Sequence, residues 1–309
     1  MAVTQADLQG DAKRRRKEGL VRGLFFAAAL VSVLISALIV VSLVGKAIVF
    51  LTKIAPNWSV LWTGGWFPRQ GQFSIPTIFV GSFIIGGIAM LVAVPLGLGS
   101  AIYLSEYAGP RSRRRLKPIV EILAGVPSIV IAYFAITIIS PDFIKKIVGT
   151  ANYNIFNLAA AGIGVGILTI PLVATIAEDA LHAVPAALRE ASYGLGARRK
   201  TTSLRIVFPA AISGITAAII IGLARAIGET MVVAVAAGGT GGSQFTTDIW
   251  GPGQTATGAM AALATGTDSV VGTGATFESL FFVGLLLFAL TFTLNVFSER
   301  FVRRVRQVY

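Results

Sequence analysis

The sequence predicts an all-α integral membrane protein with six membrane-spanning helices, and three observations lead to this prediction. Hydrophobic residues make up 55% of the 309 positions, charged residues make up only 13%, and the mean hydropathy is positive. This composition excludes a disordered chain and leaves too few charges for the surface of a soluble domain of this length. Several uncharged apolar runs reach about 18 residues or more, enough for a helix to cross a bilayer. The basic residues gather in alternate connections between these runs.

Six apolar segments are the expected spanning helices, at residues 24–44, 78–104, 119–139, 155–177, 209–238 and 280–297. Residues 1–22 form a basic tail before a transmembrane domain of residues 23–305. The first apolar run is long for the core of a signal peptide, and no convincing small-residue cleavage site follows it, so we expect it to be retained. Gly162 and Gly166 in the fourth segment allow neighbouring helices to approach closely.

The distribution of Lys and Arg predicts the orientation of the chain. The two tails, the second connection and the fourth connection together hold 20 of the 26 basic residues, and the other connections hold only four. Because basic residues accumulate in cytoplasmic loops, both termini are expected in the cytoplasm. The net charge of +12 therefore needs no nucleic acid to explain it.

Two connections on the opposite side are long enough to carry structure of their own. Residues 45–76 contain several Trp and Phe residues, which concentrate at the membrane interface. Residues 239–276 form a long outer loop rich in small residues, within which residues 256–265 are expected to be a short helix against the bundle. The chain has no cysteine and one histidine, His182, which is interpreted as an interfacial residue. No cofactor or metal site is predicted.

The fourth connection, residues 189–209, is a basic and polar loop on the predicted cytoplasmic side. It contains a spaced set of residues: Glu190, Ala191, Ser192, Gly196, Ile206, Phe208 and Pro209. This set resembles the EAA loop of ABC importer permeases, with Ser192 in place of an alanine and Phe208 in place of a leucine. The alternative, an amphipathic surface helix bound to lipid, explains the basic residues but leaves the spacing as coincidence.

The resemblance implies a type I ABC importer permease fold in the bacterial inner membrane. In that family the loop forms a short helix in a cleft of the ATPase subunit and passes ATP-driven movement to the membrane helices. Glu190, Ala191, Ser192, Gly196, Ile206 and Pro209 are therefore the expected coupling residues. The chain has no Walker A pattern, so it is expected to be a non-enzymatic subunit whose energy comes from a separate ATPase.

Two charges, Arg225 and Glu229, lie within the fifth apolar segment. A charge at the centre of a membrane helix costs about 2.5–3.5 kcal/mol on insertion scales, so such residues usually face protein or water and have a function. Four residues separate the two charges, which places them on one face of a continuous helix. Counted along such a helix from Pro209, Arg225 lies about 24 Å from the start and beyond the membrane midplane.

The segment from Leu223 to Val233, LARAIGETMVV, resembles the permease subunits of the high-affinity phosphate importer, and the GVPS sequence at residues 125–128 fits the same group. That importer pairs two related permease chains, and the present sequence resembles the PstC type more than the PstA type. The resemblance implies a second, PstA-like permease, a PstB-like ATPase dimer and an external PstS-like phosphate-binding protein as partners.

We hypothesise that Arg225 is a transient phosphate ligand, because a guanidinium group matches phosphate oxygens in bidentate geometry. Glu229 would neutralise it when the pathway is empty and could accept a hydrogen bond from a phosphate hydroxyl. A structural ion pair that ties the fifth helix to a partner chain is the alternative for these residues. For the whole chain, the alternatives are a permease for sulfate or molybdate and a membrane sensor or scaffold that does not transport.

Overall fold

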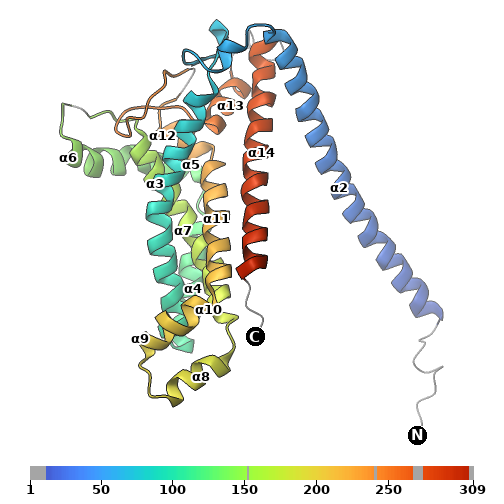
Figure 1. Ribbon diagram of the computed structural model, residues 1–309, viewed down its shortest axis with the longest axis vertical. Coiled ribbons are helices and arrows are strands. Elements are labelled where there is room, and N and C mark those ends of the chain that lie inside the picture. Colours follow the sequence, from blue (N-terminus) through green and yellow to red (C-terminus); the bar gives the residue numbers. More distant parts are fainter. Residues whose placement is uncertain (1–11, 152, 240–241, 267–273, 306–309) are drawn as a thin grey trace.

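A computed structural model describes residues 12–151, 153–239, 242–266 and 274–305, and most of this part of the chain is helical, as predicted (Figure 1). Within it, five helices are long and apolar enough to cross a membrane. A sixth span results if the bent pair Arg199–Ala210 and Ile212–Ile227 is taken as one. The first eleven residues of the predicted basic tail lie outside the described residues.

Three helices that contact one another form the centre of the bundle: α3 (Ile75–Ile102), α7 (Leu158–His182) and α11 (Ile212–Ile227). Glycines let α3 and α7 approach closely. A Cβ added at Gly162 would lie 2.7 Å from Cβ of Ile88, and one added at Gly166 would lie 2.8 Å from Cβ of Val92. The close packing predicted for these two glycines is therefore confirmed, since no larger side chain fits without displacing α3.

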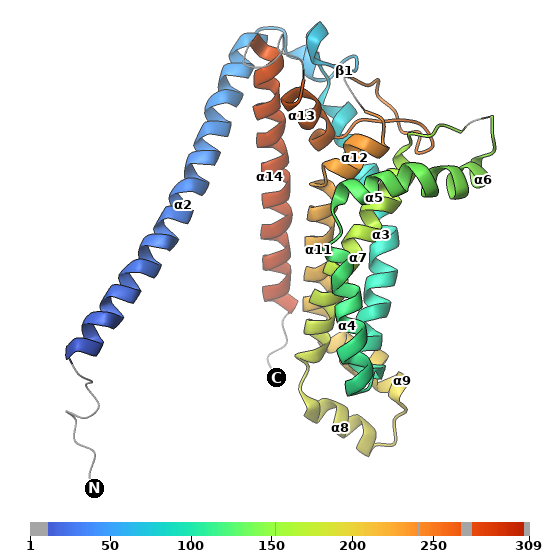
Figure 2. The same cartoon turned by 180° about the vertical axis from the view of Figure 1, so that it is seen from behind.

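The first and last helices, α2 (Ala12–Ile54) and α14 (Gly274–Val305), contact each other. With 43 residues, α2 is about 65 Å long at 1.5 Å per residue, so it extends well beyond the predicted span at both ends. Figures 1 and 2 show it leaning away from the bundle, and none of its most apolar window is buried. Such an apolar surface must face lipid or another protein.

The third predicted span, residues 119–139, is not one helix in this structure. Helix α4 (Pro110–Ala124) ends before the GVPS sequence, and α5 (Ser128–Phe134) begins after it. Pro127 explains the break, because a proline disfavours α-helical geometry at the preceding residue. The apolar stretch Ser128–Val148 then continues through a π-helical segment to α6 (Lys145–Val148) and projects sideways from the bundle (Figure 2).

The fifth predicted span, residues 209–238, is also divided. The helical segment that ends at Ala210 is bent by 71° from α11, and after Ile227 the chain breaks before α12 (Met231–Ala236). Gly228 has low helix propensity. In addition, one carboxylate oxygen of Glu229 accepts a hydrogen bond from the backbone N–H of Met231 at 3.2 Å, which favours a turn at this point.

At the end of the bundle opposite the predicted coupling loop, chain connections fold back over the helices. The short helix predicted at residues 256–265 is present as α13 (Ala256–Ala264), which contacts α14. Two short antiparallel strands, β1 (Trp66–Phe67) and β2 (Gln72–Phe73), precede α3. Trp66 and Phe73 are buried in an apolar cluster with Phe50 rather than exposed at an interface. Part of the predicted outer loop, residues 240–241 and 267–273, lies outside the described residues.

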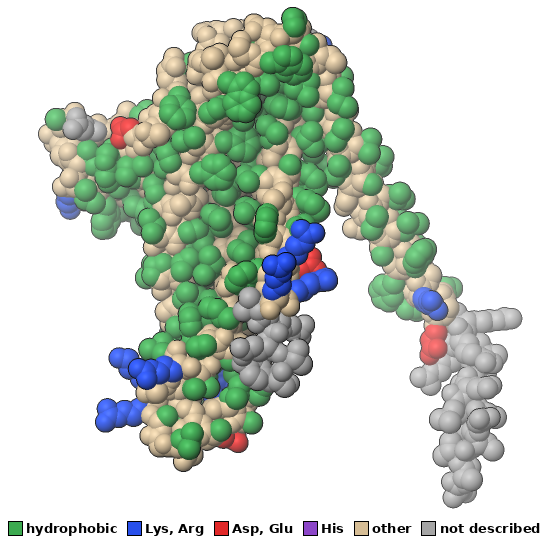
Figure 3. Space-filling model, viewed as in Figure 1, with side chains coloured by type: hydrophobic (Ala, Val, Ile, Leu, Met, Phe, Trp, Pro, Cys, Tyr) green, Lys and Arg blue, Asp and Glu red, His purple; other side chains and the backbone are tan. Residues whose placement is uncertain are grey.

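Charge and hydrophobicity separate along the long axis of the molecule. In Figure 3 hydrophobic side chains cover the middle of the visible face, and most Lys and Arg side chains lie at the lower helix ends. The amino end of α2, the carboxyl end of α14 and helix α8 (Ala186–Gly194) all point toward this end in Figures 1 and 2. The arrangement agrees with the predicted placement of the termini and the fourth connection on one side of the membrane.

Candidate functional site: coupling loop and charged helix break

The predicted coupling loop consists of helix α8, a tight turn after it and a segment that leads back to the bundle. Pro185 precedes α8, as a helix starter should, and α8 ends at Gly194. Gly196 has φ of +77°, a left-handed conformation that side chains other than glycine disfavour. The chain then turns into α9 (Arg199–Thr202), a π-helical segment and α10 (Phe208–Ala210) before it enters α11.

The residues predicted for coupling divide into an exposed set and a buried member. Exposed residues are Glu190, Ala191, Gly196, Ile206 and Pro209. Ser192 is only 8% exposed, and its hydroxyl lies 2.8 Å from that of Thr202. Ser192 therefore stabilises the loop from its buried side through this hydrogen bond, whereas the exposed residues form a surface that another protein could contact.

Arg189 connects the coupling helix to two spanning helices, a role that the sequence did not reveal. Its guanidinium donates to Glu106, in the π-helical segment Tyr103–Tyr107 that continues α3, with a shortest distance of 2.8 Å. It also donates to the carbonyl oxygens of Val184 at 2.6 Å and Leu181 at 2.8 Å, at the end of α7. Glu106 is only 5% exposed. The adjacency of arginine to the loop motif was visible, but its partner lies 83 positions away.

A second ion-pair cluster holds α4 against α7. Glu178 of α7 is buried, and it pairs with Arg113 and with Lys117, whose Nζ lies 2.7 Å from a carboxylate oxygen of Glu178. The hydrogen bond to Glu178 raises the pKa of Lys117, which keeps the amine charged. The sequence shows two cations four residues apart and an acidic pair, Glu178 and Asp179, that begins 65 positions after Arg113, and no local pattern brings them together.

Arg225 lies in the last turn of α11 and is exposed in this chain. It makes no ion pair or hydrogen bond through its side chain with the described residues. Thirteen residues separate it from Ile212, where the straight helix begins, so it lies about 20 Å along the α11 axis. The distance of about 24 Å that is expected for a straight helix from Pro209 is too long, because the chain bends before Ile212. Ile221, one turn before Arg225, is exposed on the same face.

Glu229 does not share a continuous helical face with Arg225, contrary to the sequence expectation, because α11 ends at Ile227. No ion pair joins the two side chains among the described residues. The carboxylate instead bonds to the Met231 N–H, and the Glu229 carbonyl accepts a hydrogen bond from the Thr257 hydroxyl at 2.7 Å. Glu229 thus holds the helix break against α13. Its carboxylate remains near the end of α11, four residues beyond Arg225.

Comparison with known proteins gives both a family and relatives. The family model described as "binding-protein-dependent transport system inner membrane component" matches residues 93–307. The chain is 30% identical over 295 residues to the phosphate transport system permease protein PstC of Mesorhizobium japonicum, covering 87% of this chain and 88% of the relative. It is 34% identical over 234 residues to PstA 1 of Mycobacterium tuberculosis H37Rv, covering 73% and 70%. Relatives of both types match, so the preference for the PstC type stays a prediction.

Solved structures share the fold at lower identity. A bacterial alginate ABC transporter, crystallised with an alginate-bound periplasmic protein, aligns with a TM-score of 0.64 and 16% identity over 94% of this chain and 98% of that one. The methionine ABC transporter MetNI in an inward-facing form aligns with a TM-score of 0.53 and 21% identity, over 82% and 99%. Together with the helical structure, these matches confirm the predicted fold class. The chain belongs to the binding-protein-dependent transport system inner membrane component family, the permeases of ABC importers.

Proposed function

We propose that this chain is a permease subunit of an ATP-driven importer of inorganic phosphate and forms half of its translocation pore. Relatives named as phosphate transport permeases support the cargo. The observation that carries the proposal is Arg225, an unpaired cation on an exposed face of an apolar helix. Because a charge is costly in lipid, this face must meet a partner chain or a water-filled path.

Arg225 is the proposed ligand for the passing anion. A guanidinium carries a positive charge and can donate two parallel hydrogen bonds to one phosphate. A side chain that already had an ion-pair partner would have to break that pair before binding cargo. The absence of such a partner among the described residues leaves the donors of Arg225 available.

Glu229 has a revised role in this proposal. One carboxylate oxygen is engaged by the Met231 N–H, which fixes the side chain at the break after α11. The second oxygen can accept a hydrogen bond from the hydroxyl that phosphate keeps near pH 7. Fully ionised sulfate has no such hydroxyl, so Glu229 would favour phosphate over sulfate. A fixed acceptor four residues beyond an unpaired guanidinium replaces the ion pair expected from the sequence.

Coupling is proposed to run from the exposed surface of α8 into the bundle. An ATPase subunit would contact Glu190, Ala191 and Gly196, which are exposed. Arg189 would carry a displacement of α8 to α3 and α7, because it bonds to Glu106 and to carbonyl groups at the end of α7. The proposed complete importer contains a second permease, two ATPase subunits and an external phosphate-binding protein.

Phosphate uptake in cells that lack their own high-affinity importer tests the cargo site. Arg225→Ala should abolish uptake, Arg225→Lys should reduce it, and Glu229→Gln should reduce discrimination against sulfate. Arg115→Ala is a matched control, since Arg115 is an exposed arginine without a partner among the described residues. Membrane levels of each variant must match the wild type. Wild-type uptake and selectivity in all three variants would refute the role of this site.

Competition separates phosphate from the other oxyanions. Uptake of labelled phosphate should persist in excess sulfate or molybdate and be lost in excess unlabelled phosphate. A chain that transports sulfate or molybdate would show the opposite pattern.

Purification of the tagged chain tests the assembly, because an ATPase and a second permease should co-purify with it. A sensor or scaffold that does not transport would be recovered without an ATPase.

A further inference from the structure

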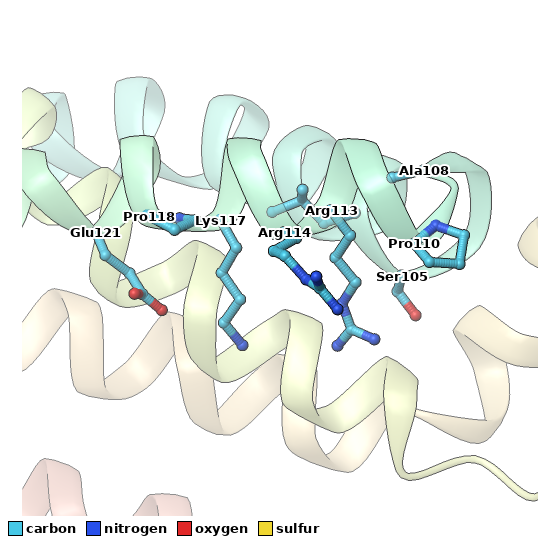
Figure 4. A pocket seen from close by; sticks show the side chains of 9 residues that line it. Ser105, Ala108, Pro110, Arg113, Arg114, Lys117, Pro118 and Glu121 are labelled. Carbon is cyan, nitrogen blue, oxygen red and sulfur yellow. The ribbon is translucent and has the colours of Figure 1, made fainter.

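Helix α4 borders a groove that neither the coupling loop nor the Arg225 site accounts for. The groove has a volume of about 530 Å³ and lies between the end of α3 and one face of α4. Three of its nine lining residues are cations, Arg113, Arg114 and Lys117, and the lining also includes one acidic residue, Glu121, and Ser105. Figure 4 shows the three cations and Glu121 along α4, with Ser105 in the segment before it and with Arg113 and Lys117 extending toward α7. The volume is in the range of small-molecule sites.

The three cations are held in different ways. Arg113 and Lys117 are anchored by the buried carboxylate of Glu178, and each side chain is still 31% exposed. Glu178 fixes their position without covering them. Arg114, one helical turn from Lys117, has no ion pair or hydrogen bond with the described residues and is exposed. One free guanidinium therefore lies next to two immobilised cations.

A simple excess of cytoplasmic charge does not account for this arrangement. Residues that only set topology need no fixed geometry, and Arg111 and Arg115 of the same helix are exposed without lining the groove. By contrast, Glu178 is a buried carboxylate whose desolvation is costly unless cations pair with it. The pairing orders two cations at the wall of a groove that is large enough for a tetrahedral anion and its water.

We propose that this groove binds a phosphate group on the cytoplasmic side of the bundle, with Arg114 as the principal ligand and Arg113 and Lys117 as supporting cations. The Ser105 hydroxyl, which donates to Glu106 at 3.1 Å in this structure, would have to turn from that carboxylate to donate to the phosphate group. Glu121 can accept a hydrogen bond from a protonated oxygen of inorganic phosphate. The phosphate group has two possible sources, inorganic phosphate that leaves the pore and the headgroup of an anionic phospholipid. Only the first source rests on the proposed cargo.

The test uses the assembled importer with Arg225→Gln in every sample, so that the proposed pore site cannot contribute. Binding of radiolabelled inorganic phosphate is measured by equilibrium dialysis in detergent without anionic lipid. Retention of phosphatidylglycerol is measured by native mass spectrometry. Arg114→Gln should weaken one of these two ligands roughly tenfold, the size expected for loss of a hydrogen bond to a charged group. Arg115→Gln is the matched control on the same helix and should leave both unchanged.

Each result has a defined meaning. Selective loss of inorganic phosphate in Arg114→Gln identifies departing cargo, and selective loss of phosphatidylglycerol identifies lipid. Equal effects of Arg114→Gln and Arg115→Gln, or no effect of either, would overturn the proposed groove site. Failure here leaves the uptake experiment on Arg225 untouched, so the two proposals can fail separately.

Discussion

Arg189 of α8 bonds to three residues outside its own helix. It joins α8 to the buried carboxylate of Glu106 and to two carbonyl groups at the end of α7. The side chains of Arg189 and Glu106 are 20% and 3% exposed. Because Glu106 is buried, removal of Arg189 is costly, since it leaves the carboxylate buried and unpaired.

At this residue scale, Arg189→Ala should lower the free energy of unfolding by about 3 kcal/mol, the cost of breaking a buried ion pair from one side. Thermal unfolding of the purified importer measures the effect. Arg198→Ala, which removes an exposed arginine side chain without an ion pair among the described residues, should change stability little. Glu106→Gln combined with Arg189→Ala should recover part of the loss. Equal melting temperatures for Arg189→Ala and Arg198→Ala would rule out this tether.

Among the elements, α8 and the turn after it form the proposed contact with the ATPase. Gly196 has a left-handed backbone, whereas Gly194, two residues earlier, lies in the last turn of α8 with open space around it. The two glycines therefore differ in whether their backbone conformation tolerates a side chain. Only Gly196 is required by backbone geometry, and its position fixes the direction in which the loop leaves α8.

Gly196→Ala should therefore distort the loop exit at a cost of about 1–2 kcal/mol, because a Cβ disfavours the left-handed conformation. The expected phenotype is an importer that assembles and hydrolyses ATP but transports phosphate poorly. The ratio of ATP hydrolysed to phosphate transported in proteoliposomes measures it. Gly194→Ala is the control and should keep the wild-type ratio. An unchanged ratio in Gly196→Ala would argue against this turn as part of the coupling element.

The contact between helices α3 and α7 forms the core of the bundle. Gly166→Ala would bring a Cβ within 2.8 Å of Val92 and 2.9 Å of the Ala89 carbonyl oxygen. Overpacking of this kind costs about 1–3 kcal/mol, so the melting temperature of the importer should fall. Gly87→Ala places its Cβ in open space on α3 and should be neutral. A neutral Gly166→Ala would mean that the helices can separate without cost.

At the scale of the whole molecule, the charge distribution and the positions of the helix ends predict the same orientation of the chain in the membrane. The ends of α2 and α14 point the same way as α8, and the connection before α3 lies at the other end (Figure 1). Accumulation of basic residues predicts that the end with α8 is cytoplasmic. The absence of cysteine from the sequence makes this orientation directly testable.

Single cysteines report sidedness without a background signal. A membrane-impermeant maleimide applied to intact cells with a permeable outer membrane should label Phe245→Cys, which lies in the exposed outer connection. It should label Ser112→Cys, exposed at the start of α4, only after the inner membrane is opened. Labelling in the reverse order would invert the topology and remove α8 from the reach of a cytoplasmic ATPase.

The sequence by itself determined the properties that depend on local composition and spacing. Long apolar runs identified a helical membrane protein, basic connections gave a topology, and the spaced residues from Glu190 to Pro209 identified the importer permease. Hydropathy also placed Arg225 in an apolar segment, which predicts a function for it. These signals can be read locally because burial in lipid acts on each segment of about 20 residues separately.

Only the tertiary structure decided how the charges are paired and where the helices break. Arg189 bonds to Glu106 and Arg113 bonds to Glu178, partners 83 and 65 positions apart. Such distances depend on how the helices pack, which no local pattern encodes. The same holds for Glu229, whose place at the end of α11 is fixed by Thr257 of a distant helix rather than by Arg225. Hydropathy averages over short breaks, so the turns at residues 125–127 and 228–230 were hidden within apparently continuous spans.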